Sequence, residues 1–377
     1  MAGIVSGTFA RYAETSNNDG NLTRFLFTDD LHQQVKDKLL FARQGWMGPD
    51  RGGEDPQDEK EVYFPILQRT DLGKKRGDHV ILPLMKNLTG AATVGNSKLL
   101  ETSGEEAFAF AYLKVYVETM RHATGYVGDM SEVRNPFLSE ESASSQLAKW
   151  LADQEEKATL DAYYDGFSAH VVTGISAASA TDNPNWFYGG DATTEENVDS
   201  NDTLGTADFE KMSVWAEVNK INAIRVPDGV GGMEEGYAMI IHPFQMYDLR
   251  QDSVWQQAQR EGNERGWKNP IFSGAKGMYA GIFIYTHTLC EVAASGVTDR
   301  NNKRRAIFTG AHAIGYATAV PEQVNRRAED DYGVVRAWAI SKTYGYARAD
   351  WLNDSDSGTT SFNQSSAIVT TYAAQPY

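Results

Sequence analysis

The sequence has very little cysteine: Cys290 is the only one among 377 residues. A single cysteine excludes a disulfide within the chain and any metal site built from several thiolates. It also fits a protein that folds in a reducing cytosol, where disulfides are rare. We therefore expect packing and partner contacts, rather than covalent links, to stabilise the fold.

Long apolar segments are missing as well. No apolar run approaches about 18 residues, and the N-terminus lacks the charged-then-apolar pattern of a signal peptide. The sequence therefore predicts neither export nor a membrane-spanning helix. Hydrophobic residues still make up 41% of the chain, enough to build real cores, and the length suits two or three lobes.

Basic residues are scarce relative to acidic ones. The chain has 35 Lys and Arg against 51 Asp and Glu, a formal net charge of −16 and a pI of about 4.9. Between Ala158 and Glu210 it has ten acidic residues and no Lys or Arg. Such a surface repels nucleic acid, which disfavours sequence-specific DNA binding.

Recognisable catalytic motifs are absent too. The seven histidines show no HExxH or other metal-ligand spacing. His242 follows an apolar run and is a candidate general base, but no Ser, Cys or carboxylate accompanies it in a known motif. A structural histidine is the favoured interpretation, and we expect no catalytic residue, no cofactor and no metal site.

Four other motifs are better explained by structure than by chemistry. Residues 229–232 are glycine-rich but lack the Lys-Ser/Thr of a P-loop, and residues 274–277 form a lone GxxG. Both favour tight turns. Residues 329–331 are acidic and favour a solvated turn over a cation site, while Arg304-Arg305 and Arg326-Arg327 are interpreted as strand-flanking or interface charges.

The most prominent predicted element is one long helix over residues 139–172, about 34 residues and about 50 Å long. Leu147 and Leu151 fall on one side of it, at about 100° per residue, whereas Leu160 and Phe167 fall near the opposite side. The helix should therefore contact two bodies. We expect Leu151 and Phe167 to be buried and needed for assembly-competent protein.

Before this helix the chain is predicted to form an arm and an extended β excursion. Residues 1–60 look like an arm, with a short helix near residues 31–40. Strand-like runs at 62–67 and 79–85 flank a hairpin or long loop whose tip is basic, with Lys74, Lys75 and Arg76. Residues 108–119 alternate cleanly, with apolar side chains on both faces, so the excursion should pack on another surface, for example that of another subunit.

After the helix a polar, acidic connection over residues 176–205 leads to a mixed α and β lobe. Its predicted helices cover residues 207–224 and a segment from Pro243 toward Trp255. Its predicted strands are 237–241, 282–286, 306–309, 313–318 and 334–341. The predicted fold class is therefore α+β.

Several segments resemble the major capsid proteins of tailed bacteriophages, typified by phages related to coliphage N4. The hallmark is the order of glycines and aromatic residues in residues 269–282, NPIFSGAKGMYAGI. Residues 306–313 (AIFTGAHA), Asp331-Tyr332-Gly333 followed by residues 338–351, and residues 77–90 add to the resemblance. Together they cover residues 60–351; the segment 176–205 and residues 352–377 depart from the family pattern.

The resemblance implies an HK97-like fold with an N-terminal arm, an extended β-hairpin loop, a spine helix, and peripheral and axial domains. It divides the chain into an arm (1–60), the extended loop and adjoining strands (61–126), a peripheral domain with spine helix and acidic insertion (127–206), an axial domain (207–330), and a return to the peripheral domain with a C-terminal tail (331–377).

The resemblance also implies a function that needs no active site. Copies would assemble in the bacterial host cytoplasm into pentamers and hexamers of an icosahedral head, the virion capsid, which encloses double-stranded DNA held nonspecifically. Implied partners are the protein itself, a portal, a scaffold and a cement or decoration protein, with no membrane. Lys74, Lys75 and Arg76 are expected to dock on an acidic surface of a neighbour, and a Lys–Asn crosslink between subunits is not expected.

Two alternatives remain open at this point. An encapsulin-like nanocompartment shares the fold and would enclose protein cargo. A soluble α+β hydrolase would use His242 with nearby carboxylates and would be a monomer or small oligomer. Particle mass separates a container from a hydrolase, and enclosed nucleic acid separates a virus from a compartment.

Overall fold

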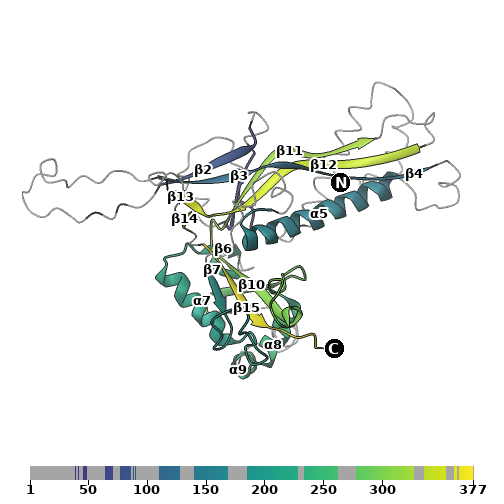
Figure 1. Cartoon of the computed structure of the whole chain (residues 1–377). Helices are drawn as coiled ribbons and strands as arrows, with labels where there is room; N and C mark the ends of the chain where they lie inside the picture. Colours follow the sequence, from purple (N-terminus) through teal and green to yellow (C-terminus); the bar gives the residue numbers. More distant parts are fainter. Residues whose placement is uncertain are drawn as a thin grey trace, which may run out of the picture.

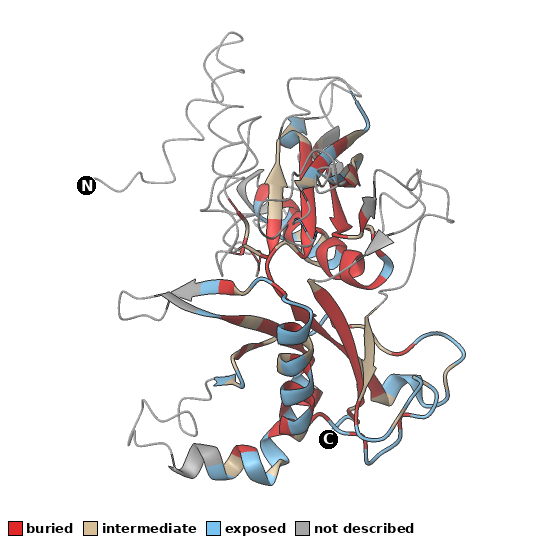
Figure 2. Cartoon of the chain, turned by 90° about the vertical axis from the view of Figure 1, so that its left-hand side faces the viewer, coloured by how far each residue is buried: buried red, intermediate tan, exposed pale blue. Residues whose placement is uncertain are grey.

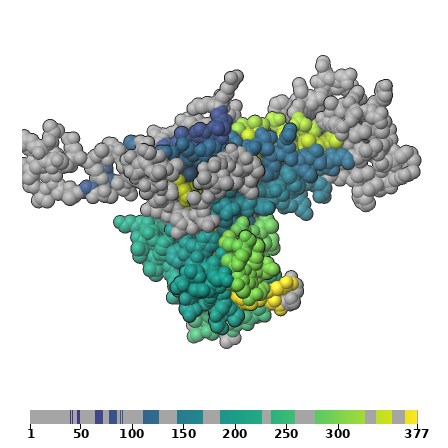
Figure 3. Space-filling view, in the orientation of Figure 1, coloured from purple at the N-terminus to yellow at the C-terminus, as the bar shows by residue number. Residues whose placement is uncertain are grey.

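The computed structural model has two bodies, an elongated upper body and a lower body suspended beneath its middle (Figure 1). It describes residues 39, 41, 46–48, 64–70, 77–85, 88, 90, 110–127, 140–168, 185–227, 233–261, 277–326, 335–353, 361–362 and 365–376. The far halves of the long upper strands, together with the start of the long helix, extend beyond the lower body (Figure 3).

The upper body is built on a four-stranded sheet in the order β1-β11-β12-β4. Its centre is an antiparallel ribbon of β11 (Ile314–Arg326) and β12 (Val335–Arg348), whose register shifts on either side of Val320. β4 (Glu118–Val127) pairs antiparallel with β12, and β1 (Ile66–Arg69) pairs parallel with β11. The sheet therefore joins segments that are far apart in the sequence.

The helix α5 (Glu140–Asp165) packs along this sheet, chiefly on β12. Leu147 and Leu151 are buried in one cluster with Ile340 and Tyr344 of β12, and Figure 2 shows exposed residues on the opposite side of the helix. Over residues 158–164 every side chain is buried, Leu160 among them. The expectation that both sides of the helix are covered is therefore confirmed for its C-terminal part.

The predicted end of this helix is wrong. Gly166 has a φ of 88°, a left-handed conformation that commonly terminates helices, and its N–H donates to the carbonyl of Ala162 at 3.1 Å. Phe167 consequently lies beyond the helix, where it forms a β-bridge with Ala347 and its ring lies 6.1 Å from that of Tyr116. Phe167 thus contacts the strands rather than a second helix face.

A second sheet of the upper body has the order β14-β13-β3-β2. Alternation along β3 is confirmed, because Ala111, Leu113 and Val115 are buried while the residues between them are more exposed. A Cβ on Gly315 of β11 would lie only 2.8 Å from the Val115 side chain, so glycine lets the two sheets approach closely. The strands are β2 (His79–Met85), β3 (Phe110–Tyr116), β13 (Trp351–Asn353) and β14 (Ser361–Phe362).

One prediction about this excursion is wrong, and another is resolved. The predicted strand 108–119 is two strands, because the chain leaves β3 at Val117 and enters the other sheet as β4. Of the two alternatives for the segment between the strand-like runs, a hairpin or a long loop, the hairpin does not form, since β1 pairs with β11 whereas β2 pairs with β3. Its tip, Lys74, Lys75 and Arg76, lies outside the described residues.

The lower body contains a sheet in the order β5-β15-β10-β7-β9-β8, with β6 paired on β7. Phe209, Met239, Phe308 and Val369 belong to its buried cluster. The strands are β5 (Trp186–Tyr188), β6 (Ile224–Pro227), β7 (Met233–Ile241), β8 (Met278–Tyr279), β9 (Ile282–Thr286), β10 (Lys303–Thr309) and β15 (Ser366–Tyr372); the helices are α7 (Thr206–Val218), α8 (Pro243–Gln251), α9 (Ser253–Glu261) and a 3₁₀ turn, Arg300–Asn302.

The predicted helices and the predicted strands 237–241, 282–286 and 306–309 occur in this lobe, most of them with shifted ends. The strands predicted at 313–318 and 334–341 do not belong to it, because they form β11 and β12 of the upper sheet. The helix predicted to reach Ile224 ends at Val218, and the segment after Pro243 is two helices separated at Asp252. Residues 185–205 of the acidic connection belong to the lower body, because β5 pairs parallel with β15. None of the described helices has the length and hydropathy needed to cross a membrane.

Candidate functional site

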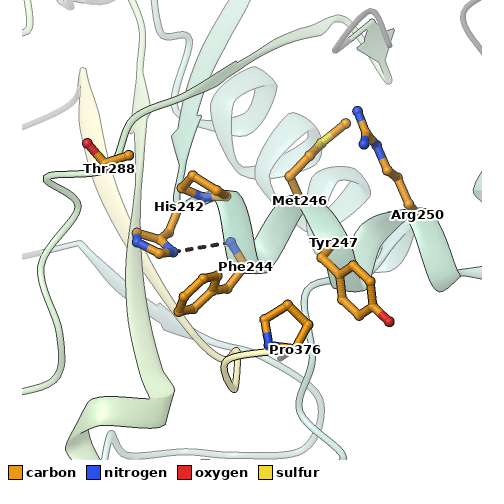
Figure 4. Close-up of a pocket in the computed structure, with 8 residues that line it drawn as sticks. His242, Phe244, Met246, Tyr247, Arg250, Thr288 and Pro376 are labelled. Carbon is orange, nitrogen blue, oxygen red and sulfur yellow. Dashed lines mark hydrogen bonds between the residues drawn. The ribbon is translucent and has the colours of Figure 1, made fainter.

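The pocket beside α8 tests the hydrolase alternative directly. It has a volume of about 550 Å³, and its lining includes His242, Phe244, Tyr247 and Thr288 (Figure 4). His242 is the N-cap of α8, and its Nδ1 accepts a hydrogen bond from the Phe244 N–H at 3.2 Å. Burial, helped by nearby Arg304, lowers the pKa of His242 to about 4. A neutral histidine that caps a helix confirms the structural interpretation.

The structure describes only parts of the other motifs that the sequence analysis considered. Gly277, directly before β8, has a φ of 76°, a left-handed conformation that favours glycine, while residues 274–276 of the predicted turn lie outside the described residues. Residues 229–232 and 329–331 lie outside the described residues, as does Arg327, while Arg326 ends β11. Within the described part of the chain, no three His, Cys, Asp or Glu side chains gather as metal ligands would.

A buried ion triad joins three elements of the upper body. Lys342 of β12 donates from Nζ to Glu155 Oε1 of α5 at 2.6 Å and to Glu322 Oε1 of β11 at 2.7 Å. All three side chains are nearly inaccessible to solvent. Burial alone lowers the pKa of a lysine, but the two carboxylates outweigh it and raise the pKa of Lys342 well above its usual value. The triad fixes where α5 lies on the β11–β12 ribbon.

A buried arginine holds the C-terminal end of α5. The Arg348 guanidinium donates to the carbonyls of Tyr163 and Tyr164 at 3.2 and 3.0 Å, and it is paired with Asp350. Carbonyls in the last turn of a helix have no partner within the helix, and a cation there also interacts favourably with the helix dipole. Arg348 therefore explains, together with Gly166, why the helix stops at this point.

The same end of α5 forms the junction with the lower body. The Tyr163 hydroxyl shares a hydrogen bond with Thr309 Oγ1 at 3.0 Å, and the Tyr164 hydroxyl donates to the Arg305 carbonyl at 2.9 Å. About two turns earlier in the helix, His287 Nε2 lies 3.1 Å from Glu156 Oε2. Directional bonds from two places along one helix therefore fix the two bodies relative to each other.

Arg305 links this junction to the acidic segment. Its guanidinium makes two bonds to the Glu195 carboxylate, at 2.8 and 3.0 Å, and a third to Glu291 at 3.1 Å. The guanidinium also lies 4.6 Å from the centre of the Trp186 ring. Arg305 therefore holds parts of the lower body together from within β10, so the prediction of a strand-flanking or interface charge is wrong for this residue.

The acidic segment receives further cationic support from β10. Lys303 Nζ, which is buried, donates to the carbonyls of Glu195 and Glu196 at 3.0 and 2.8 Å. The Glu196 carboxylate accepts from the Thr298 hydroxyl at 2.7 Å. The cationic side chains of β10 therefore compensate the negative charge of this acidic segment, which has no Lys or Arg of its own.

Carboxylates accumulate where α5 meets the lower body. Burial is the main cause that raises the pKa of Asp161 to about 6 and that of Glu291 to about 7. The charge of Asp165 adds to both shifts, while Lys157 and Arg305 act in the opposite direction. The junction is consequently sensitive to pH near neutrality.

The outward face of the β2–β3 pair carries exposed apolar side chains beside Lys114, which lies opposite Ile81. Ile81 on β2 is 52% exposed and Phe110 on β3 is 50% exposed, although both belong to a paired sheet. Exposed apolar surface of this kind is typical of interaction sites. The face opposite Leu82 and Leu113 therefore suits contact with another surface, as the alternating pattern predicted.

The sequence interpretation missed Lys342 and Arg348, which organise the upper body. Both lie on the buried side of β12, in step with Ile340, Tyr344 and Tyr346. The sequence does contain one signal for them: in this strand the charged residues alternate in step with tyrosines and an isoleucine, so they lie on the same, buried side of the strand. A charge that is buried needs partners of opposite charge or hydrogen-bond acceptors. Their partners are remote in sequence and carry no local pattern.

This architecture defines a structural subunit: its buried charges position elements, and its open pocket has no catalytic pair. The chain matches the family model for phage capsid protein over residues 10–375. The protein therefore belongs to the phage capsid protein family. It is a structural protein of the virion capsid and not an enzyme, which sets aside both the hydrolase and the nanocompartment alternatives.

Individual phage capsid proteins are similar to this chain in sequence or in structure. The major capsid protein of Pseudomonas phage KPP25 is 23% identical over 339 residues, covering 82% of this chain and 87% of the relative. The capsid of Ralstonia phage GP4 aligns with a TM-score of 0.67 and 21% identity, covering 90% of this chain and 93% of that chain. The cyanophage Pam1 capsid aligns at 0.65 and 18% identity, covering 89% and 92%. The HK97-like α+β fold is confirmed.

Proposed function

We propose that this protein is the major capsid protein of a tailed double-stranded DNA phage and that its copies form the pentamers and hexamers of an icosahedral head. The observation that carries the proposal is the family match over residues 10–375, nearly the whole chain. The two-body architecture, with directional bonds between the bodies, supports it because a shell needs subunits of fixed shape. The specific relation to N4-like phages remains a prediction.

The proposed domains follow the two bodies. We assign the upper body, with α5 as the spine helix, to the peripheral domain and the lower body to the axial domain. The excursion of β2 and β3 supplies the base of the extended loop. Residues 366–372 pair within the lower sheet, so we extend the axial domain to include β15.

The proposed partners follow from the shell. Copies of this chain, a portal, a scaffold and a cement or decoration protein would contact its outer surfaces, and packaged DNA would be held nonspecifically. Assembly is proposed to take place in the host cytoplasm. Lys74, Lys75 and Arg76 are proposed to dock on an acidic surface of a neighbour, while Leu151 and Phe167 maintain the shape that assembly requires.

Electron microscopy and mass measurement of the purified protein, expressed alone and with the scaffold of its own virus, test this proposal. We expect megadalton icosahedral shells in at least the second case. A protein that remains a monomer or small oligomer under both conditions would overturn the proposal. Particles that enclose a specific protein cargo instead of nucleic acid would indicate a nanocompartment.

A further inference from the structure

We propose that the pocket beside α8 (Figure 4) is a docking site for an extended peptide of a partner protein, and that a carboxylate of this peptide pairs with Arg304. The inference goes beyond the proposed function, because it assigns a ligand of stated chemistry to one pocket. It rests on an arginine at the pocket wall that has no counter-ion and on the apolar lining around it.

Arg304 belongs to β10 and lies against the wall of this pocket. The centre of its guanidinium is 5.5 Å from the centre of the Phe244 ring, which in turn is 4.5 Å from the His242 ring. Both rings line the pocket. Burial, and after it the charge of Arg304, lowers the pKa of His242, so this histidine is neutral at neutral pH. Two lining side chains therefore connect Arg304 to the pocket.

The charge of Arg304 is not compensated within the described part of the chain. Its guanidinium has no ion pair and no hydrogen bond to a described residue, and its Nε is shielded from solvent without a partner. The residue as a whole is still partly exposed. Burial lowers the pKa of Arg304, and no carboxylate opposes this shift. A buried polar group without a partner requires an explanation, and an anion that binds there supplies one.

The carboxylates nearby in sequence or structure serve elsewhere. The adjacent Arg305 receives both Glu195 and Glu291, so the chain does supply partners to an arginine that supports its own fold. Asp248 is the only acidic residue of α8, but its Oδ2 is buried without a hydrogen-bond partner. Burial is the only cause that raises the pKa of Asp248 to about 6, so Arg304 does not pair with it.

The lining of the pocket indicates what accompanies the anion. Its volume of about 550 Å³ is in the usual range of ligand-binding pockets. Tyr247 is 47% exposed, so its ring offers apolar surface to a ligand. Although the chain has 51 acidic residues, none is among the described lining residues. The lining combines prolines and aromatic rings with one further arginine: Pro243, Phe244, Tyr247, Pro376 and Arg250.

A peptide carboxylate fits this combination better than a nucleic-acid phosphate. A guanidinium binds both anions, but a phosphodiester backbone has no apolar side chains that would cover the prolines and rings of the lining. A nucleic acid would also bring many negative charges close to a chain whose net charge is −16. A single Asp or Glu next to an aromatic or aliphatic side chain satisfies Arg304 and the lining together.

Selection from a library of random short peptides against the purified full-length chain tests the proposal. We expect the selected peptides to carry Asp or Glu beside an aromatic or aliphatic residue. Binding of one selected peptide should weaken on the order of tenfold in Arg304→Gln, because a charged hydrogen-bonded pair is lost. Arg225→Gln is the control, since Arg225 is paired with Glu235 on the β6–β7 pair and should leave binding unchanged. Selection of peptides without acidic residues, or equal binding by Arg304→Gln, would overturn the proposal.

A double-mutant cycle shows whether the pairing is direct. Replacement of the acidic residue of the peptide by its amide should weaken binding to the wild-type chain but not to Arg304→Gln. Independent, additive effects would contradict the pairing. Arg304→Gln should keep or raise the melting temperature, whereas Arg305→Gln should lower it; equal losses would show that Arg304 only supports the fold. None of these measurements requires shells, so their failure would leave the proposed function standing.

Discussion

Lys342 Nζ lies 2.6 Å from Glu155 Oε1, so an ion pair connects β12 to α5 inside the upper body. Glu322 completes the site from β11, and the three groups carry a formal net charge of −1. Such a site is stable only while every member is paired, because an uncompensated buried charge is costly.

Removal of the lysine is therefore the most damaging change at this site. Lys342→Met leaves two buried carboxylates facing each other, and we expect it to lower the free energy of unfolding by about 3 to 5 kcal/mol. Chemical denaturation of the unassembled subunit measures the loss. Lys211→Met is the matched control, because Lys211 is half exposed and should change stability by no more than about 0.5 kcal/mol. Equal stabilities of the two variants would contradict a structural role for the triad.

Truncation of Leu151 should cost more than truncation of Phe167. Leu151 is completely buried under β12, and Leu151→Ala should remove about 2 to 5 kcal/mol of stability together with most soluble protein. Phe167 is only partly buried beside Tyr116, so Phe167→Ala should cost less. Thermal unfolding and shell yield measure both effects, with Leu289→Ala at an exposed position as the control. An unchanged shell yield for Phe167→Ala would exclude its proposed part in assembly.

Stability of the junction should fall as the pH rises from about 4 toward neutrality. The folded-state pKa values of Asp161 and Glu291, about 6 and about 7, exceed the ordinary values of 3.8 and 4.5, chiefly through burial. A raised carboxyl pKa means that the folded state binds the proton more tightly, so the stabilisation is complete below about pH 4 and disappears between about pH 6 and 7.

Asp161→Asn and Glu291→Gln should therefore flatten the decrease in melting temperature between about pH 4 and 7. Glu196→Gln is the control, because hydrogen bonds from Thr298 lower the pKa of Glu196 and its contribution changes in the opposite direction at lower pH. A pH profile of the double variant that is parallel to wild type would show that these carboxylates do not control the junction.

Charge reversal of the basic segment tests the proposed docking. Replacement of Lys74, Lys75 and Arg76 by Glu should leave the subunit folded but reduce shell formation, and wild-type assembly should weaken as salt rises. Each exposed ion pair contributes only about 0 to 1 kcal/mol, but a shell repeats it at every subunit. The Debye length also falls from about 10 Å at 0.1 M to about 3 Å at 1 M salt. Light scattering of assembly reactions measures both effects; equal yields across that range would indicate a merely solvated loop.

Denaturing electrophoresis of mature particles tests for covalent links between subunits. We expect one band near 41.7 kDa, because the sequence has no motif that assigns a catalytic Glu and an acceptor Asn for a Lys–Asn bond. A ladder of multimers that survives boiling would show that this expectation is wrong.

The spacing of apolar residues along the sequence predicted the elements whose buried side depends only on neighbouring residues of the same helix or strand. The alternation in β3 and the face of α5 that carries Leu147 follow from burial, and the structure confirms both. The stop at Gly166 was not predictable from periodicity, because a glycine inside a helical pattern is often tolerated. Whether it ends the helix depends here on Arg348, which is remote in sequence.

Nonlocal pairing explains the remaining errors. Nothing in the sequence of β1 indicates that it joins β11 rather than β2, since the choice depends on which sheet buries its apolar side. The ion pairs of Lys342 were not predictable either, because the carboxylates that it contacts belong to residues 155 and 322, which are remote in sequence. Family resemblance supplied the overall fold where pairwise contacts were not predictable from the sequence.

The direct continuation of the chain from β3 through Val117 into β4 has a mechanical consequence. The β2–β3 pair extends from one sheet while β4 is fixed in the other along ten residues against β12. A pull on the excursion therefore reaches β4 along its own backbone and loads the ladder to β12 in shear, so that many hydrogen bonds resist together. If a neighbouring subunit held the excursion, tension would therefore pass into the β11–β12 ribbon of this subunit without separating the hydrogen bonds one at a time.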